Sequence, residues 1–249
     1  MMYSKWRGLC GILSLAGSLT LLGCGASGNS YVRVVNASQG LSNFTVVAGQ
    51  TPIVAALPFG TEGVQQQGQY TTTDNSGNYR PLGAGTDQPL YLYSTQNTKL
   101  VSTTQSFIKS TPYTIVIEGA ASSPMFQVLT DNDVAPSSGS YSLRVMDTST
   151  MAGPVDVYLT AAGAGVGGSP VVGNMQFQNV TNPYLQLSPG NLEVQVTPAG
   201  NPSRVLASKA FSPASGKVYS IFFFDPSVAG GANYSVQVVN DPILGAAPK

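Results

Sequence analysis

An internal repeat constrains the fold of this chain more than any other feature of its 249 residues. Segments of the first half recur in the same order in the second half, at offsets of 105 to 111 residues. Each match is short, but a shared order at a nearly constant spacing indicates two copies of one unit. The matching segments are 32–38 with 143–149, 44–47 with 155–158, 79–85 with 184–190, 113–115 with 219–221, and 126–131 with 236–241.

A stretch of linker composition lies between the two copies. Residues 131–140 include Pro136 and Gly139, and such residues favour turns and connections over regular elements. Each copy has about 105 to 110 residues, which is long enough to bury a core of its own. The predicted organisation is a signal peptide at 1–23, a tether at 24–30, a domain at 31–134, a linker at 135–140 and a domain at 141–249.

Within each copy the apolar residues recur with a period of two. Apolar and polar residues alternate from Leu192 to Thr197, and turn sequences such as Ser188-Pro189-Gly190 separate segments of this kind. The segment from Val218 to Phe224 is almost entirely apolar, which predicts a central strand covered on both faces. The sequence therefore predicts an all-β fold of two tandem immunoglobulin-like β-sandwich domains, with two small barrels as the alternative.

The order of the motifs resembles a family of bacterial secreted and lipoprotein domains of unknown function. Repeats of that family open with a V-R-V-V-x-A-S strand and a V-D-V-Y strand, and continue with a Y-x-x-L-x-x-G turn and a Y-T/S-apolar strand. The second copy follows this pattern more closely than the first, in which Phe44-Thr45-Val46-Val47 replaces V-D-V-Y and residues 61–78 depart most. The resemblance implies a fold and a secreted location, and it implies no activity.

The first 24 residues have the features of a lipoprotein export signal. Lys5 and Arg7 precede an apolar stretch that ends in Leu21-Leu22-Gly23-Cys24. This ending resembles a bacterial lipobox, which implies lipidation of Cys24 and cleavage before it. A transmembrane anchor is the alternative, but the stretch is shorter than the ~20 residues that a span needs. Gly25 follows the cysteine, which by analogy with Gram-negative sorting favours the outer membrane.

Composition excludes several classes of function. The chain has 11 basic and 11 acidic residues, and no basic cluster that would neutralise nucleic-acid phosphates. It has no histidine, and its two cysteines are Cys10, within the signal peptide, and Cys24, the predicted lipidation site directly after it. The usual base for a nucleophile and the usual zinc ligands are therefore absent. No phosphate-binding loop or dinucleotide motif occurs, so we predict no cofactor and no catalytic residue.

Two groups of charged residues are the remaining candidates for a site. Asp131 and Asp133 lie at the junction of the copies, where their oxygens are weak candidates for Ca²⁺ ligands, and an ordinary Asx turn before a linker is the favoured interpretation. Arg144 and Asp156 lie mid-strand on consecutive predicted strands, and we expect them to form a structural cross-strand ion pair.

Three functional hypotheses follow. The first is a non-enzymatic, membrane-anchored envelope lipoprotein that serves as a binding or structural module and contacts the membrane through the lipid on Cys24. The second is a glycan-binding envelope protein that uses tyrosine-rich loops as contacts. The third is a hydrolase that uses carboxylates alone. A protein or glycan partner is compatible with the first two hypotheses, and the sequence does not identify it.

Overall fold

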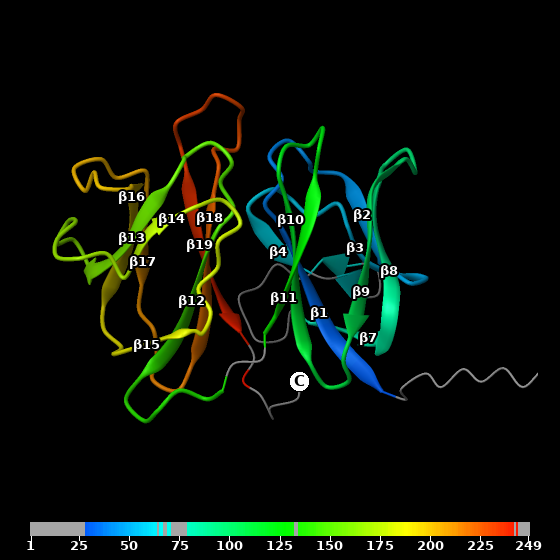
Figure 1. Ribbon diagram of the computed structural model, residues 1–249, viewed down its shortest axis with the longest axis horizontal. Helices are drawn as coiled ribbons and strands as arrows, with labels where there is room; N and C mark the ends of the chain where they lie inside the picture. The colour runs from blue at the N-terminus through cyan, green and yellow to red at the C-terminus, as the bar shows by residue number, and fades with distance from the viewer. Residues whose placement is uncertain are drawn as a thin grey trace, which may run out of the picture.

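The computed structural model describes residues 28–63, 65–66, 69–70, 79–131, 134–241 and 243. The predicted signal peptide, Cys24 and Asp133 lie outside the described residues. The described part consists of strands, turns and connections without a helix, in two β-sandwiches that lie side by side (Figure 1). The predicted fold class is confirmed. Among these residues no helix is long and apolar enough to cross a bilayer.

The first sandwich has an inner sheet and an outer sheet, where the inner sheet is the one that faces the second sandwich. The inner sheet has the order β11 (Met125–Thr130), β10 (Pro112–Glu118), β1 (Asn29–Asn36) and β4 (Thr61–Gly63), with β7 (Arg80–Gly83) also paired to β1. The outer sheet has the order β3 (Thr51–Ala55), β2 (Phe44–Ala48), β8 (Gly85–Ser94) and β9 (Lys99–Phe107). A short hairpin, β5 (Gln65–Gln66) and β6 (Gln69–Tyr70), is separate from both sheets.

The second sandwich repeats this arrangement. Its inner sheet has the order β15 (Leu185–Leu187), β12 (Tyr141–Asp147), β18 (Val218–Phe224) and β19 (Ser235–Asp241). Its outer sheet has the order β14 (Val172–Met175), β13 (Val155–Ala161), β16 (Leu192–Pro198) and β17 (Ala207–Phe211). In both inner sheets the first strand pairs in parallel with the second-last one, β1 with β10 and β12 with β18.

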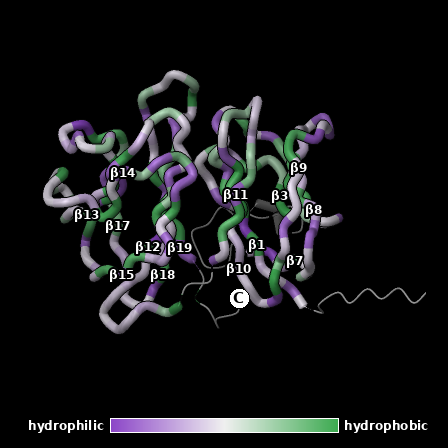
Figure 2. Tube along the Cα trace, in the orientation of Figure 1, coloured by the Kyte–Doolittle hydropathy of each residue, from purple (hydrophilic) through white to green (hydrophobic). Residues whose placement is uncertain are grey.

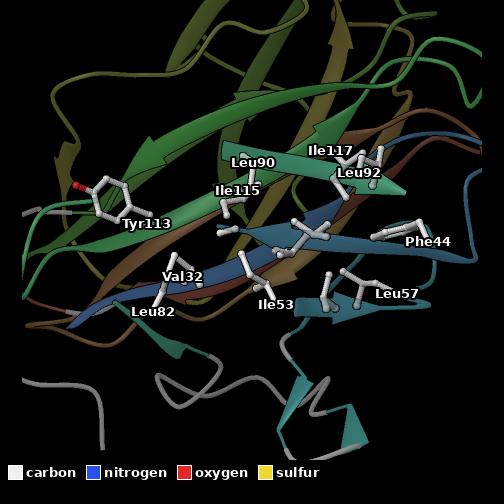
Figure 3. Close-up of a cluster of buried hydrophobic side chains, with 14 of the residues drawn as sticks. Val32, Phe44, Ile53, Leu57, Leu82, Leu90, Leu92, Tyr113, Ile115 and Ile117 are labelled. Carbon is white, nitrogen blue, oxygen red and sulfur yellow. The ribbon is translucent and has the colours of Figure 1, made fainter. Parts of the chain in front are cut away.

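Three apolar clusters hold the four sheets together. One fills the first sandwich, where Val32 and Ile115 of the inner sheet pack with Phe44 and Leu92 of the outer sheet (Figure 3). A second fills the other sandwich, and a third joins the two inner sheets. Hydrophobic residues accordingly lie along the strands of both halves (Figure 2).

The central strands of the inner sheets are covered on both faces, as predicted for β18. Every residue of β10 and β12 is buried, and β18 is buried at six of its seven positions. Successive strand residues point to opposite faces, so one set faces the outer sheet of its own sandwich and the other set faces the neighbouring sandwich. In β1, Val34 belongs to the first sandwich's core, whereas Val35 belongs to the cluster between the sandwiches.

Candidate functional site

The inter-sandwich faces of the inner strands carry a buried polar group that the repeat duplicates. Its eight members form four repeat-related pairs, and we call them the arginine–aspartate cluster. The pairs are Arg33 with Arg144, Tyr79 with Tyr184, Thr114 with Ser220, and Asp131 with Asp241. Both arginines and both aspartates are at most 5% exposed. The two copies thus place the same side chains at one shared interface.

Each arginine binds its own sandwich through Nε and the other sandwich through Nη2. The Nε of Arg33 donates to Oγ1 of Thr114 at 2.7 Å, and the Nε of Arg144 donates to Oγ of Ser220 at 2.9 Å. Across the interface, Nη2 of Arg33 pairs with Asp241 and Nη2 of Arg144 pairs with Asp131. Two reciprocal ion pairs therefore link the sandwiches.

The aspartates receive further donors from their own sandwiches. The Tyr79 hydroxyl donates to Oδ2 of Asp131 at 2.8 Å, and the Tyr184 hydroxyl donates to Oδ2 of Asp241 at 2.8 Å. Each guanidinium carbon lies 5.0 Å from the centre of the tyrosine ring of its own copy, within cation–π range. These donors offset the cost of burying charge, because the carboxylates accept several hydrogen bonds as well as an ion pair.

The pKa shifts of Asp241, Arg33 and Arg144 favour the charged forms of these three side chains. Burial alone would raise the pKa of Asp241, but the guanidinium groups of Arg33 and Arg144 outweigh it and hold this pKa below its usual value. Burial alone would lower the pKa of Arg144, but the carboxylates of Asp131 and Asp241 raise it above its usual value. Because these pKa values move away from neutral pH, the carboxylate and the guanidinium groups are suited to binding and are not suited to proton transfer near pH 7.

The two halves of the cluster differ at one position. Glu62 and Val180 occupy corresponding places, since Glu62 is the partner of Val35 in β1 and Val180 forms a bridge with Met146 in β12. Nη1 of Arg33 donates to Oε2 of Glu62 at 3.2 Å and to the carbonyl of Asn240 at 3.0 Å.

Nη1 of Arg144, in contrast, has a single long contact among the described residues, at 3.4 Å to the carbonyl of Thr130. An open cavity of about 570 Å³ lies beside it, between β11 and the segment 180–184. Ligand pockets typically have volumes of this order. The lining includes Arg144, Thr130, Val180, Asn182 and Tyr184. Both sandwiches contribute to this cavity, which is our candidate binding site.

A second polar region lies elsewhere on the same interface. Oε1 of Glu118 in β10 accepts a hydrogen bond at 2.6 Å from Gln178, which belongs to the second sandwich. Burial raises the pKa of Glu118 to about 7. Burial also raises the pKa of Asp147 to about 7, and its Oδ2 has no partner among the described residues.

Residues 30–158 match a family described as a domain of unknown function, DUF4397. This match spans just over half of the chain. The chain belongs to the DUF4397 family. The matched segment contains nearly all of the first sandwich, together with β12 and the first half of β13 in the second, so it includes Arg33, Asp131 and Arg144.

Other comparisons add little about this DUF4397 protein. No significantly similar protein is found among curated proteins. Among solved structures, an α-glucan-binding streptococcal virulence factor is 10% identical with a TM-score of 0.27, covering 86% of this chain and 97% of its own. A family 26 carbohydrate-binding module from Eubacterium rectale, solved with maltoheptaose, is 12% identical with a TM-score of 0.26, covering 86% and 97%. These TM-scores are low, and the likenesses carry no argument about the fold or ligand of this chain.

The expected ion pair between Arg144 and Asp156 is wrong. Arg144 lies in the inner sheet and Asp156 in the outer sheet, because the chain crosses between sheets from β12 to β13. The carboxylate of Asp156 accepts hydrogen bonds from the backbone N–H groups of Asn174 and Gly200, each at 2.8 Å.

Asp131, one of the two calcium candidates, belongs to the arginine–aspartate cluster. Its carboxylate accepts from Arg144, Tyr79 and Thr114, so these donors occupy the oxygens that a calcium ion would need. No group of three potential metal ligands occurs within the described ranges. Asp133 and the lipidation candidate Cys24 lie outside those ranges.

The tyrosines expected in ligand-contacting loops lie mostly in strands. Tyr91 and Tyr93 are half-buried in β8, with ring centres 5.8 Å apart. Among described tyrosines that retain exposure, only Tyr184 and Tyr234 lie outside strands. Tyr184 lines the cavity beside Arg144, so one loop tyrosine does face a candidate site.

Sequence reasoning missed the cluster, although its members stood within the repeated motifs. Arg33 and Arg144, Tyr79 and Tyr184, and Asp131 and Asp241 occupy matching positions of those segments. The sequence signal for the cluster was that these polar residues are identical in the two copies, although the surrounding residues of the repeated segments differ. The sequence alone did not indicate that the two copies pack with these faces together.

Proposed function

We propose that this protein is a non-enzymatic, lipid-anchored envelope protein whose two sandwiches act as one rigid binding unit. The arginine–aspartate cluster is the observation that carries this proposal. Two reciprocal ion pairs and a buried apolar cluster cross the interface. Domains that move independently usually share an interface that is smaller and more polar. A rigid pair presents surfaces formed by both halves in a fixed geometry.

The lipobox supports the anchoring part of the proposal. Cys24 lies only five positions before Asn29, where β1 begins. A lipid on this cysteine would therefore hold the first sandwich close to the membrane, in the outer membrane if the cell is Gram-negative. Two or more acyl chains anchor a protein stably, whereas a single chain binds marginally.

The composition and the cluster support the non-enzymatic part. The sequence offers no histidine and no cysteine besides Cys10 and Cys24, and the two arginines and two aspartates of the cluster are engaged with one another. Screening the protein against hydrolase substrates tests this part. Turnover that a single Asp→Asn substitution abolishes would overturn it.

Metabolic labelling with a palmitate analogue tests the anchor. The wild-type chain should incorporate label and partition into detergent, and Cys24→Ser should lose both properties because it lacks the acceptor thiol. Cys10→Ser is the matched control, since Cys10 lies within the predicted signal, and it should behave as wild type. Equal labelling of Cys24→Ser and wild type would contradict the proposal.

A further inference from the structure

We propose that the cavity beside Arg144 binds an uncharged, hydroxyl-rich ligand of the saccharide class. This inference rests on the binding role proposed above and adds a site and a ligand class to it. Both sandwiches line the cavity, with Thr130 from the first and the segment 180–184 from the second. Such a site exists only when the two halves are held in the observed arrangement.

The first sandwich contains a hydrogen-bond acceptor for its arginine that the second sandwich lacks. At Arg33 the side chain of Glu62 supplies an acceptor oxygen to Nη1. Glu62 also lines the smaller cavity of about 380 Å³ on that side, and Arg33 is not part of its wall. The protein therefore supplies its own acceptor to Arg33 and covers the guanidinium.

At Arg144 the corresponding residue is Val180, which has no acceptor oxygen. Arg144 is 97% buried, yet it forms part of the wall of the larger cavity. Within the described part of the chain, its Nη1 has only the 3.4 Å contact with Thr130, which is long for a hydrogen bond. An oxygen of a bound ligand at this point would take the position that Glu62 occupies at Arg33.

The rest of the wall suits a sugar. Tyr184 and Pro183 provide an aromatic ring and an apolar ring, and the exposed Asn182 amide makes no hydrogen bond within the described part of the chain. An amide, a guanidinium and a carbonyl together offer donors and an acceptor to hydroxyl groups, and aromatic rings contact the apolar faces of a ligand.

The charge balance of the cluster favours a neutral ligand. Three carboxylates, those of Glu62, Asp131 and Asp241, already surround two guanidinium groups. A carboxylate or phosphate of a ligand beside Arg144 would place a fourth negative charge next to this buried cluster, which is unfavourable. A hydroxyl oxygen accepts from Nη1 without adding charge.

Titration of the full chain with neutral mono- and oligosaccharides tests the inference. The chain is held in a detergent without a sugar headgroup, and binding is followed by calorimetry and ligand-observed NMR. At least one neutral saccharide should bind, and glucuronate and inorganic phosphate should bind more weakly. Failure of every neutral sugar to bind, or preference for either anion, would overturn the inference.

Two substitutions locate the site. Asn182→Ala should weaken saccharide binding by about tenfold, because it removes hydrogen bonds to the ligand without removing any within the protein. Val180→Gln should abolish binding, because its amide oxygen supplies an acceptor to Arg144, as Glu62 does to Arg33, without adding a negative charge. Asn201→Ala is the matched control in the exposed turn between β16 and β17, and it should bind as wild type.

Other results distinguish this inference from the proposed function. If saccharide binds but Asn182→Ala and Val180→Gln leave the affinity unchanged, the site lies elsewhere and the inference is wrong. If Val180→Gln lowers the thermal midpoint, the affinity of Asn182→Ala alone decides whether the inference holds. Failure here leaves the lipid anchor untouched, because palmitate labelling of Cys24 does not depend on the cavity.

Discussion

Individual charged residues show how this interface differs from an ordinary apolar one. Arg33 and Arg144 each bond to both sandwiches. Replacing either arginine would therefore leave a buried carboxylate without its ion-pair partner. A complete buried ion pair adds little net stability compared with apolar residues of similar size, whereas a broken one is costly. The cluster therefore specifies the arrangement of the sandwiches more than it stabilises them.

Replacing Arg144 tests this reasoning. Arg144→Met should lower the free energy of unfolding by about 3 to 5 kcal/mol, because Asp131 loses its ion-pair partner within a buried site. Urea unfolding measures the change. Arg204→Met is the matched control, since Arg204 is exposed, and it should shift the free energy by less than about 0.5 kcal/mol. Equal effects of the two substitutions would refute the role of the cluster.

The buried Asp147 predicts an unusual pH dependence. Its pKa is about 7 in the folded protein, above its usual value of 3.8, so the folded state binds the proton more tightly than the unfolded state. The associated stability is complete below about pH 4 and is lost as the pH rises to about 7. The full shift corresponds to up to about 4 kcal/mol.

Asp147→Asn should remove most of this loss, because the amide carries no charge at any pH. The first copy already has an asparagine, Asn36, at the matching position, where its amide donates to the carbonyls of Leu41 and Leu57. Unfolding at pH 4 and pH 8 gives the comparison: the variant should be more stable than wild type at pH 8 and similar at pH 4. A variant that is less stable at pH 8 would contradict the assigned pKa.

The inner strands combine two patterns within one element. Alternate residues of β18 face the core of the second sandwich and the first sandwich, so Ile221 and Phe223 pack in one cluster and Phe222 and Phe224 in another. A strand with one solvent-exposed face would show polar residues at every second position. In β18 the corresponding positions hold Ser220 of the arginine–aspartate cluster and the apolar residues Phe222 and Phe224.

Phe222→Ala tests the importance of the inter-sandwich face of β18. Phe222 is fully buried in the cluster that joins the inner sheets, and its truncation should cost about 3 to 5 kcal/mol. Thermal or urea unfolding provides the measurement. Ile108→Ala, at a side chain that is 65% exposed, is the control and should have a small effect. A small effect at Phe222 would mean that the sandwiches do not pack as described.

The elements were more predictable than their partners. Alternation and turns are local, so they predicted the strand from Leu192 to Thr197, and the apolar composition of Val218–Phe224 predicted its coverage on both faces. Pairing is not local: β12 is followed by β13, but its neighbours in the sheet are β15 and β18. Arg144 pairs with Asp131, 13 positions away in the sequence, and with Asp241, 97 positions away. No local sequence pattern specifies partners at such separations.

Considered as a whole, the molecule is a stack of four sheets with three apolar interiors (Figure 1). The middle interior is the one that sequence analysis did not predict, because each copy was expected to be complete by itself. Members of the third cluster come from both halves of the chain, as Val35 and Val239 illustrate. Neither sandwich by itself covers the face of its inner sheet that contributes to the third cluster, so we expect each to depend on the other for stability.

This dependence predicts a single unfolding transition for the full chain. In scanning calorimetry the calorimetric and van't Hoff enthalpies should agree, because separation of the sandwiches would expose the third apolar cluster and the arginine–aspartate cluster to water. Val239→Glu places a carboxylate within the third cluster and should split the transition into two, one for each sandwich. Val228→Glu introduces the same charge at a position that is 70% exposed and should leave one transition. Two transitions in the unmodified chain would mean that the halves fold independently, and the rigid binding unit proposed for this protein would then be wrong.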